Sequence, residues 1–474
     1  MKRLGIGVLV GALVFTVAVA GSSPDSVNAA PAPSGAKNVI LFVGDGMGMS
    51  TVTAARILEG QMQGSSGEGN ELSFELFPRT GLSQVHNHDF QVPDSAGTMT
   101  AMMSGKKTDR GLINISKDGV RGACHTIAGN ELTSWFVDAE NLGLATGVVT
   151  TARLSHATPA GTYANSIDRD FEADVDLPLG CSQADIASQL IDFPHGDGIE
   201  VALGGGRRNF TTTAMSDPEV TNKTGRRLDG RNLPAEWAAR PDATYVWNQA
   251  QFDAVDLNTT NHLLGLFSRS HMEYEADRSA DVAGEPSLTE MTEMAINMLS
   301  RDSDGFVLVV EAARIDHAHH ATNAHRALLE TIELSNAVAK AVEMVDTAET
   351  LIVVTADHGQ SLTISGYPER GNDILGLEDN EDGSDGLPYT TLGYATGPEQ
   401  HLEPDGSRTD LSGVDTTDID FQQASAVPRA GAAHTGEDVP VYAIGPRSGK
   451  FGKVLGQPQI GKLIRDALER YHGG

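Results

Sequence analysis

A short apolar run that ends in a dense group of acidic and imidazole residues constrains the fold of this chain more than any other feature. Residues 306–310 read Phe-Val-Leu-Val-Val, which predicts a buried strand, and residues 311–320 then carry two carboxylates and three imidazoles. Because a helix is predicted from Asn323 onward, these polar groups are expected in the turn at the carboxyl end of the strand, where open α/β sheets place their sites. Imidazole and carboxylate ligands together favour a borderline metal such as zinc, and a solvated polar loop is the alternative.

Three other segments also set polar groups beside an apolar run. A carboxylate follows the run 38–43, an adjacent carboxylate and imidazole follow the run 351–355, and an imidazole precedes the run 439–444. Each alone is explained equally well as a helix cap or a turn former. Taken together they predict two sets of three metal ligands. The first set is Asp316, His320 and His434, and the second is Asp45, Asp357 and His358.

Three protein ligands with one open position are typical of catalytic zinc, and two such ions about 4 Å apart form the clamp used in phosphoryl transfer. A nucleophile is available at Ser95, because Asp94-Ser95 precedes a run of small residues and reads as a helix start. An ordinary N-cap is the alternative reading. Beside a metal cation and a helix N-terminus, a serine hydroxyl can ionise near neutral pH.

These motifs give the chain a resemblance to the alkaline phosphatase family, closer to the animal type than to the enterobacterial type. The resemblance extends from about Lys37 to about Leu468, essentially the whole chain after its first 36 residues. It rests on Val-Pro-Asp-Ser-Ala at 92–96, Arg-Ile-Asp-His at 314–317, Thr-Ala-Asp-His at 355–358 and His-Thr-Gly-Glu-Asp-Val at 434–439.

The resemblance implies a role for each matching residue. Ser95 corresponds to the serine that becomes phosphorylated, and the two ligand sets correspond to the two zinc sites. A magnesium ion is implied at Asp45, Thr158 and Glu311. Arg169 corresponds to the arginine that binds two non-bridging phosphate oxygens, which suits its planar, bidentate guanidinium. Taken alone, Arg169 would be read as a surface ion-pair residue.

Three positions separate this chain from one branch of the family or another. His156 and His317 occupy places beside the metal ligands where the enterobacterial type has Asp and Lys, and they agree with the animal type. A His pair there is expected to weaken the hold on magnesium relative to a carboxylate. Gln360 stands where the family usually has a histidine. The zinc ligands therefore lack that titratable neighbour, and the pH dependence of the activity does not follow from the resemblance.

The animal type also carries a structural calcium site. Glu219 and Glu285 resemble its acidic ligands, whereas Ser268 stands where another carboxylate is expected. Calcium is therefore as well supported as its absence.

Cys124 and Cys181 are the only cysteines, and no CxxC or Cys-His spacing accompanies them. A similar pair in the animal type implies that they form a disulfide in an oxidising compartment, with two separate buried thiols as the alternative. Cys124 and Cys181 are 57 residues apart. Closing a loop of that length stabilises the folded state by ~4 kcal/mol in the chain-entropy model.

The first 20 residues read as a secretory leader, with a basic start, an apolar run and the cleavage signal Ala-Val-Ala at 18–20. A second cleavage signal ends at Ala29, and residues 21–36 read as a flexible spacer. An uncleaved membrane anchor is the alternative. The polar carboxyl end carries no signal for a lipid anchor. We therefore expect a secreted or periplasmic protein that is free of the membrane after cleavage.

The chain holds 34 basic and 64 acidic residues, for a net charge of -30. This balance disfavours a nucleic acid as a surface-bound partner. It is explained equally by adaptation to high salt, where screening removes self-repulsion, and by an ordinarily acidic secreted protein.

Apolar runs alternate with helical patterns along most of the chain, which predicts an α/β fold with a mostly parallel central sheet between helix layers. The catalytic domain is expected to comprise 37–362 and 433–474. Residues 363–432, rich in Gly, Asp and Pro, interrupt the alternation. Their pattern alone predicts an irregular loop, and the family resemblance implies a crown-like insertion over the site and at a homodimer interface. The expected strands are 38–43, 145–150, 199–203, 306–310, 351–355 and 439–443.

The sequence thus predicts a secreted phosphomonoesterase that acts through a phosphoserine with two zinc ions and one magnesium ion. A phosphodiesterase or phosphonate hydrolase of the same superfamily is the nearest rival, but those enzymes often use threonine and lack a counterpart of Arg169. A zinc-storing protein is the rival from another class, and it would need neither Ser95 nor Arg169.

Overall fold

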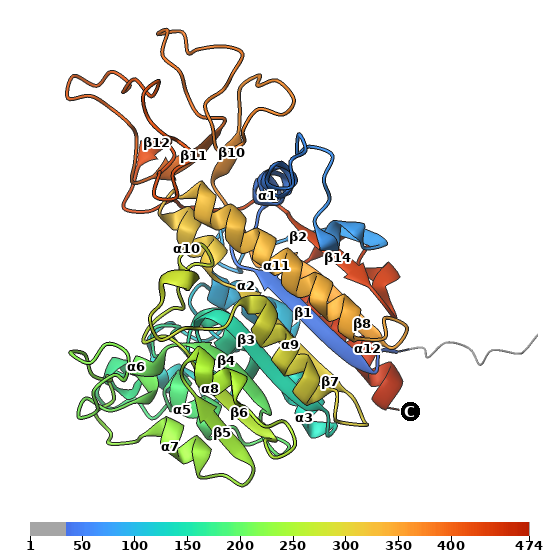
Figure 1. The fold of residues 1–474 in the computed structure, drawn as a ribbon. Coiled ribbons are helices and arrows are strands. Elements are labelled where there is room, and N and C mark those ends of the chain that lie inside the picture. The colour runs from blue at the N-terminus through green and yellow to red at the C-terminus, as the bar shows by residue number, and fades with distance from the viewer. Residues whose placement is uncertain (1–34, 474) are drawn as a thin grey trace, which may run out of the picture. The chain divides into compact units, whose positions relative to one another are not determined.

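A ten-stranded sheet forms the centre of the molecule in the computed structural model, which describes residues 35–473 (Figure 1). The predicted leader and nearly all of the spacer lie outside the described residues. The strands lie in the order β15 (Val454–Gly456), β2 (Arg79–Gln84), β14 (Val439–Ile444), β8 (Thr350–Ala356), β1 (Asn38–Gly44), β7 (Phe306–Ala312), β3 (Ala145–Arg153), β4 (Val201–Gly205), β6 (His262–Leu266) and β5 (Ala243–Val246).

Most neighbouring strands in this sheet run parallel, as the sequence predicted. The exception is β14, which pairs antiparallel with both β8 and β2. The expected strand at 199–203 begins two residues later, at Val201. Strands β2, β5, β6 and β15 were not predicted, because their short segments carry weaker apolar patterns.

Helices cover both faces of the sheet, so that two hydrophobic cores form. On β1, Ile40 and Phe42 face one core and Val39 and Leu41 face the other, which is the alternation expected of a strand buried on both sides. The first core packs against α1 (Met49–Met62), α9 (Leu288–Leu299) and α11 (Ala324–Met344). The second packs against α2 (Ser95–Ser104), α3 (Trp135–Asn141), α4 (Ala157–Tyr163), α5 (Ile186–Ile191), α7 (Leu233–Ala238) and α12 (Pro458–His472). The remaining helices are α6 (Arg207–Phe210), α8 (Gln249–Asp253) and α10 (Arg314–His320).

The register of the three central strands brings their carboxyl ends to one place. Val43 on β1 lies beside Glu311 on β7 and beside Thr355 on β8. The residues that directly follow β1 and β8 are Asp45 and Asp357, so side chains from distant parts of the sequence meet at this edge.

Residues 363–432 contribute most of a second, three-stranded sheet, which Figure 1 shows beyond the carboxyl ends of the main strands. It consists of β10 (Leu362–Ile364), β11 (Leu392–Gly397) and β12 (Ser425–Pro428), and a further two-stranded sheet pairs β9 (Gly359–Gln360) with β13 (His434–Thr435). Leu392 and Tyr394 are buried in the first core. The irregular loop predicted from the pattern alone is therefore wrong for this part of the segment.

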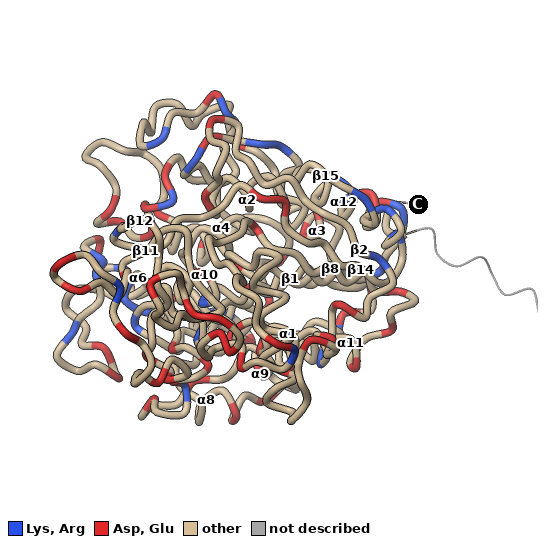
Figure 2. The backbone as a smooth tube through the Cα atoms, turned by 90° about the horizontal axis from the view of Figure 1, so that it is seen from above, with Lys and Arg blue, Asp and Glu red and all other residues tan. Residues whose placement is uncertain are grey.

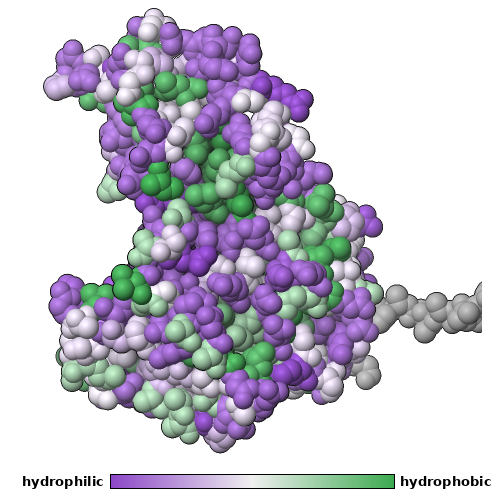
Figure 3. All heavy atoms as spheres, in the orientation of Figure 1, coloured by the Kyte–Doolittle hydropathy of each residue, from purple (hydrophilic) through white to green (hydrophobic). Residues whose placement is uncertain are grey.

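Acidic residues are spread over the helices and loops of the surface, including α1, α9 and α11, as Figure 2 shows. The face in Figure 3 is mostly hydrophilic, with an apolar area next to the region of β10–β12. No helix within residues 35–473 is long and apolar enough to cross a membrane. Cys124 and Cys181 form the predicted disulfide, with their Cα atoms 5.5 Å apart.

Candidate metal centre

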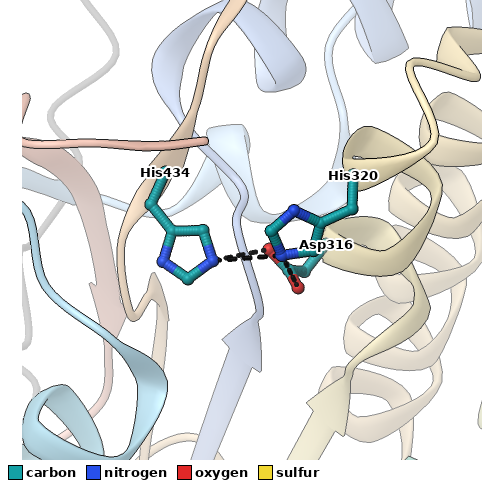
Figure 4. A group of neighbouring side chains, drawn as sticks. All are labelled: Asp316, His320 and His434. Atoms are coloured by element: carbon teal, nitrogen blue, oxygen red, sulfur yellow. Dashed lines mark hydrogen bonds and ion pairs between the residues drawn. The ribbon is translucent and has the colours of Figure 1, made fainter. Parts of the chain in front are cut away.

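The first predicted ligand set comes together at one end of α10. Asp316 and His320 lie one helical turn apart on this helix, and β13 supplies His434. His320 Nε2 lies 3.2 Å from Asp316 Oδ2, and His434 Nε2 lies 3.5 Å from Asp316 Oδ1. The two Nε2 atoms are 3.2 Å apart, and Figure 4 shows the rings directed toward each other and the carboxylate. Three ligand atoms therefore converge on one point, within reach of a single ion.

Backbone carbonyls orient both imidazoles of this set. His320 Nδ1 lies 2.6 Å from Ala432 O, and His434 Nδ1 lies 2.9 Å from Pro93 O. A ring that donates its Nδ1–H to a carbonyl keeps the Nε2 lone pair for the site. Burial alone would raise the pKa of Asp316, but His320 and His434 hold that pKa well below its ordinary value. The carboxylate is thus favoured in the charged form that a metal needs.

The second predicted set is fully buried. His358 Nε2 lies 3.4 Å from Asp45 Oδ1 and 3.2 Å from Asp357 Oδ2. The other oxygen of Asp357 accepts the backbone N–H of Gly46 at 3.0 Å, which fixes the turn after β1. Both oxygens of Asp45 have no hydrogen-bond partner among the described residues, and burial, followed by the charge of Asp357, raises its pKa well above the ordinary value. A buried carboxylate without a partner is costly, and a cation would compensate it.

Ser95 is the first residue of α2, as predicted, and Asp94 is its N-cap. Asp94 Oδ1 accepts the backbone N–H of Gly97 at 3.2 Å. Ser95 is 2% exposed, and its Oγ lies 3.3 Å from Nε2 of His358. The hydroxyl therefore lies at a helix N-terminus and next to the second ligand set.

Arg169 is part of this cluster rather than a surface residue. Its guanidinium donates to Asp94 Oδ2 at 3.0 Å and to His156 Nε2 at 3.1 Å. Burial opposes ionisation of Asp94, but Arg169 lowers the pKa of Asp94 below its ordinary value. The N-cap of the serine helix and the arginine are thus held together as one unit.

A third group of donors lies beside the second. Asp45, His156 and Glu311 bring their ligand atoms within 4.8 Å of one another. Thr158 Oγ1 and Glu311 Oε1 are buried and have no hydrogen-bond partner among residues 35–473. Burial raises the pKa of Glu311 to about 8. Of the predicted magnesium donors, Asp45 and Glu311 are together here, and His156, predicted to lie beside the ligands, is itself within reach.

Several residues around the centre were missed or misread from the sequence. The amide of Gln360 donates to Asp316 Oδ1 at 2.5 Å, a contact that only the fold reveals. His271 lies against His317 with ring centroids 4.1 Å apart and also faces His156. His319, from the imidazole-rich run, points away: its ring nitrogens contact Thr51 Oγ1 and Tyr394 Oη. The ligand-bearing segment is the helix α10, not the turn that the sequence predicted.

The acidic residues considered for calcium are used within the protein. Glu219 pairs with Arg207 at 2.6 Å, and Glu285 accepts the backbone N–H of Glu273 at 2.6 Å. Neither belongs to a group of three ligand atoms of the kind found at the main centre, within the described residues.

The sheet, the buried serine and the clustered carboxylates and imidazoles together define a metal-dependent hydrolase of the α/β class. Residues 36–470 match the family model described as "Alkaline phosphatase". Over 424 residues the chain is 43% identical to the tissue-nonspecific isozyme of alkaline phosphatase from Gallus gallus, covering 87% of this chain and 80% of that protein. The chain therefore belongs to the alkaline phosphatase family.

Other relatives agree with this assignment. The alkaline phosphatase of Gadus morhua is 41% identical over 420 residues, which cover 87% of each chain. The structure of Thermus thermophilus alkaline phosphatase matches with a TM-score of 0.66 at 25% identity and covers 93% of both chains. That of the Antarctic bacterium TAB5 shares the fold, with a TM-score of 0.63 at 20% identity, over 92% of this chain and 99% of that one. The predicted phosphomonoesterase activity and the likeness to the animal type are confirmed.

Proposed function

We propose that this phosphomonoesterase works through a phosphoserine on Ser95. The observation that carries the proposal is the position of this hydroxyl, at the N-terminus of α2 and 3.3 Å from His358 in the second ligand set. In the first step Ser95 Oγ gives its proton to solvent and attacks phosphorus, the bond to the leaving-group oxygen breaks, and that oxygen leaves with a proton from solvent. In the second step water attacks the phosphoserine, inorganic phosphate departs and Ser95 regains its proton.

Zinc ions are proposed for the two three-ligand sets, and their mixture of imidazole and carboxylate donors fits this metal. When bound, zinc supplies positive charge that favours an ionised hydroxyl and stabilises a departing oxygen. The protein contributes orientation: backbone carbonyls fix the His320 and His434 rings, and Gly46 fixes the Asp357 carboxylate.

Arg169 is proposed to bind two non-bridging phosphate oxygens. Its charge-assisted bonds to Asp94 and His156 hold the guanidinium beside the N-terminus of α2. A fixed guanidinium can grip two oxygens of a monoester, whereas a diester has one of those oxygens blocked. The proposal therefore favours monoesters over diesters.

Magnesium is proposed to bind beside the second ligand set, at Asp45, Thr158 and Glu311. Two carboxylates and a hydroxyl are the hard oxygen donors that magnesium prefers. His156 and His317 are proposed to lie beside this ion and to weaken its hold. A calcium site at Glu219 and Glu285 remains an alternative that is as well supported as its absence.

Three further features belong to the proposal. The protein is exported, its leader is removed, and it acts as a secreted or periplasmic enzyme. Residues 363–432 form a crown-like insertion on a catalytic domain of 37–362 and 433–474. Two copies associate as a homodimer.

The decisive test replaces the nucleophile. Ser95→Ala is expected to lower the hydrolysis of 4-nitrophenyl phosphate by about three or more orders of magnitude, because no other hydroxyl takes its place. Zinc content, measured on the same sample by elemental analysis, should stay near that of the wild type. Wild-type turnover in this variant would contradict the covalent mechanism.

A matched control lies on the same helix. Ser104 ends α2, and its hydroxyl donates to Thr100 O at 2.7 Å. Ser104→Ala should retain most of the activity, since it changes helix packing but not the site. Removal of metal from the wild type with a chelator should abolish activity, and added zinc should restore it.

A further inference from the structure

An exposed arginine stacked on an exposed aromatic ring lies beside the centre and has no role so far. The guanidinium carbon of Arg110 is 4.5 Å from the ring centroid of Phe90, and Phe90 is 45% exposed. Arg110 is also exposed. Its guanidinium makes no hydrogen bond or ion pair with any residue of the described chain. Because the chain has a net charge of -30, carboxylates are plentiful, and an arginine that pairs with none of them calls for a functional explanation.

The two loops that carry this pair are held against each other. Asp89 Oδ1 accepts the backbone N–H of Arg110 at 3.0 Å, and His88 Nδ1 lies 2.7 Å from Asp109 Oδ1. The backbone N–H of His88 donates to Thr108 O at 2.9 Å. Stacking on Phe90 further limits the arginine side chain, while its N–H edge stays free for an anion.

Both loops continue directly into the active centre. Next to Arg110, the N–H of Gly111 donates to Asp94 Oδ1 at 3.1 Å, and its carbonyl accepts the N–H of Arg169 at 2.8 Å. Three residues after Phe90, Pro93 O holds the ring of His434. The loop of Arg110 is therefore hydrogen-bonded to Arg169 and to the N-cap of the Ser95 helix, and the loop of Phe90 is hydrogen-bonded to His434 of the first ligand set.

A second arginine, Arg121, lies against Gly111, but its charge is already neutralised. Arg121 pairs with Asp168 at 2.8 Å and with Asp170 at 2.7 Å. Of the two, only Arg110 is free to meet a charge that arrives with the substrate.

We propose that Arg110, held by Phe90, is a specificity subsite for phosphate esters and anhydrides whose leaving group contains a second phosphate. This inference rests on the proposed function, and it requires that the leaving group departs on the side of the first ligand set, the set that includes His434. The second phosphate of such a substrate meets the guanidinium as the first one enters the site. A leaving group without an anion gains nothing from Arg110.

The test compares inorganic diphosphate with 4-nitrophenyl phosphate on the metal-loaded enzyme. Arg110→Gln is expected to lower kcat/KM for diphosphate about three- to tenfold, mainly through KM, as is usual for a partly exposed charge-assisted contact. Hydrolysis of 4-nitrophenyl phosphate should change by less than about twofold, because the contact to be lost is absent there. The difference between substrates should shrink as salt is added, since screening weakens exposed charges.

A matched control removes the same charge elsewhere. Arg79 lies on β2 and pairs with Ala443 at the end of β14 farther from the centre, so Arg79→Gln should leave the ratio of the two substrates unchanged. Phe90→Leu should lower diphosphate hydrolysis by less than Arg110→Gln does, because the charge remains but its support is lost.

Equal losses on both substrates in Arg110→Gln, an equal shift of the ratio in Arg79→Gln, or no diphosphate hydrolysis by the wild type would each overturn the subsite. Failure of the wild type to hydrolyse 4-nitrophenyl phosphate would instead refute the proposed function. The two failures are therefore distinguishable.

Discussion

Gln360 is the residue that most directly connects the two strands of the small β9–β13 pair to the metal centre. Its main chain pairs with His434, and its side-chain amide donates to Asp316 at 2.5 Å. It therefore touches two of the three residues of the first ligand set. Because its amide does not titrate, the orientation of Asp316 by this contact is expected to be independent of pH in the working range.

We predict that Gln360→Leu lowers the affinity of the first set for zinc about 10- to 100-fold, the usual effect of losing a partner that orients a metal ligand. The leucine keeps the volume but leaves Asp316 Oδ1 without its donor. Zinc release to a competing chelator measures the effect.

Gln400→Leu is the control, because Gln400 donates to Gly397 O at 2.9 Å and contacts none of the ligands. An unchanged zinc affinity in Gln360→Leu would show that the amide contact is incidental.

At the residue scale, the candidate ligands could be picked out from the sequence because most of these carboxylates and imidazoles directly follow apolar runs. It could not separate His319 from its neighbour His320, since both lie in the same run. Their directions depend on α10, which turns His319 toward Tyr394 and leaves His320 at the site. His271 was missed because three polar residues separate it from the apolar run 263–267, which was itself not predicted as a strand.

At the scale of elements, α2 is positioned by close backbone packing against α12. Gly461 on α12 faces Met102 O, and a Cβ added at this glycine would lie 2.1 Å from that oxygen. The same carbonyl accepts the indole N–H of Trp135 at 3.1 Å. Only a glycine permits this approach, so the helix that begins with Ser95 is held in place from its far end.

Gly461→Ala is expected to lower the free energy of unfolding by about 1–3 kcal/mol, as overpacking in a filled core does. Since α2 and α12 must separate, Ser95 shifts and kcat should fall as well. Denaturant unfolding and steady-state kinetics on the same sample measure both effects.

Gly456→Ala provides the comparison near the same helix. A Cβ at Gly456 would meet its nearest atom, on Pro458, at 4.0 Å, which is ordinary contact. Its stability and kcat should stay close to those of the wild type. If both variants lost stability equally, close packing at Gly461 would not be the cause.

The sequence predicted the central strands because they are continuous apolar runs, and it predicted the long helix α11 because its pattern extends over many residues. It could not predict the direction of β14, because an apolar run reads the same in parallel and antiparallel pairing. It missed α10 because seven residues between a strand and a long helix leave too short a pattern. The small sheet β10–β12 depends on pairings between distant segments, which local patterns do not reveal.

At the scale of the whole molecule, the active centre lies at the carboxyl ends of the parallel strands, while buried acids lie at their amino ends. Glu140 is 2% exposed, and Glu200 precedes β4. Both contact Thr146: its hydroxyl donates to Glu140, and its N–H donates to Glu200 Oε2 at 2.6 Å. Burial raises the pKa of Glu140 to about 7 and that of Glu200 to about 9. Near neutral pH the folded protein therefore holds Glu200 protonated and Glu140 about half protonated.

The raised pKa values of these carboxyls predict that the free energy of unfolding falls as the pH rises. In the unfolded chain a glutamate ionises near pH ~4.3, so between that pH and the raised pKa the folded state binds more protons. The stabilisation is therefore complete below the unfolded pKa and is lost as the pH rises through about 7 for Glu140 and about 9 for Glu200. Glu285 and Glu330, whose pKa values burial raises to about 8, act in the same direction.

We predict that the thermal midpoint of the metal-loaded enzyme falls between pH 6 and pH 9, with Glu140 contributing on the order of 2 kcal/mol. Glu140→Gln keeps an acceptor for Thr146 but cannot ionise, so it should flatten this slope. Glu343→Gln is the control, because the Glu343 side chain is 72% exposed and pairs only with Lys340 among the described residues. A slope unchanged by Glu140→Gln, or flattened equally by Glu343→Gln, would show that the buried acids at the amino ends of the strands do not set the response to pH.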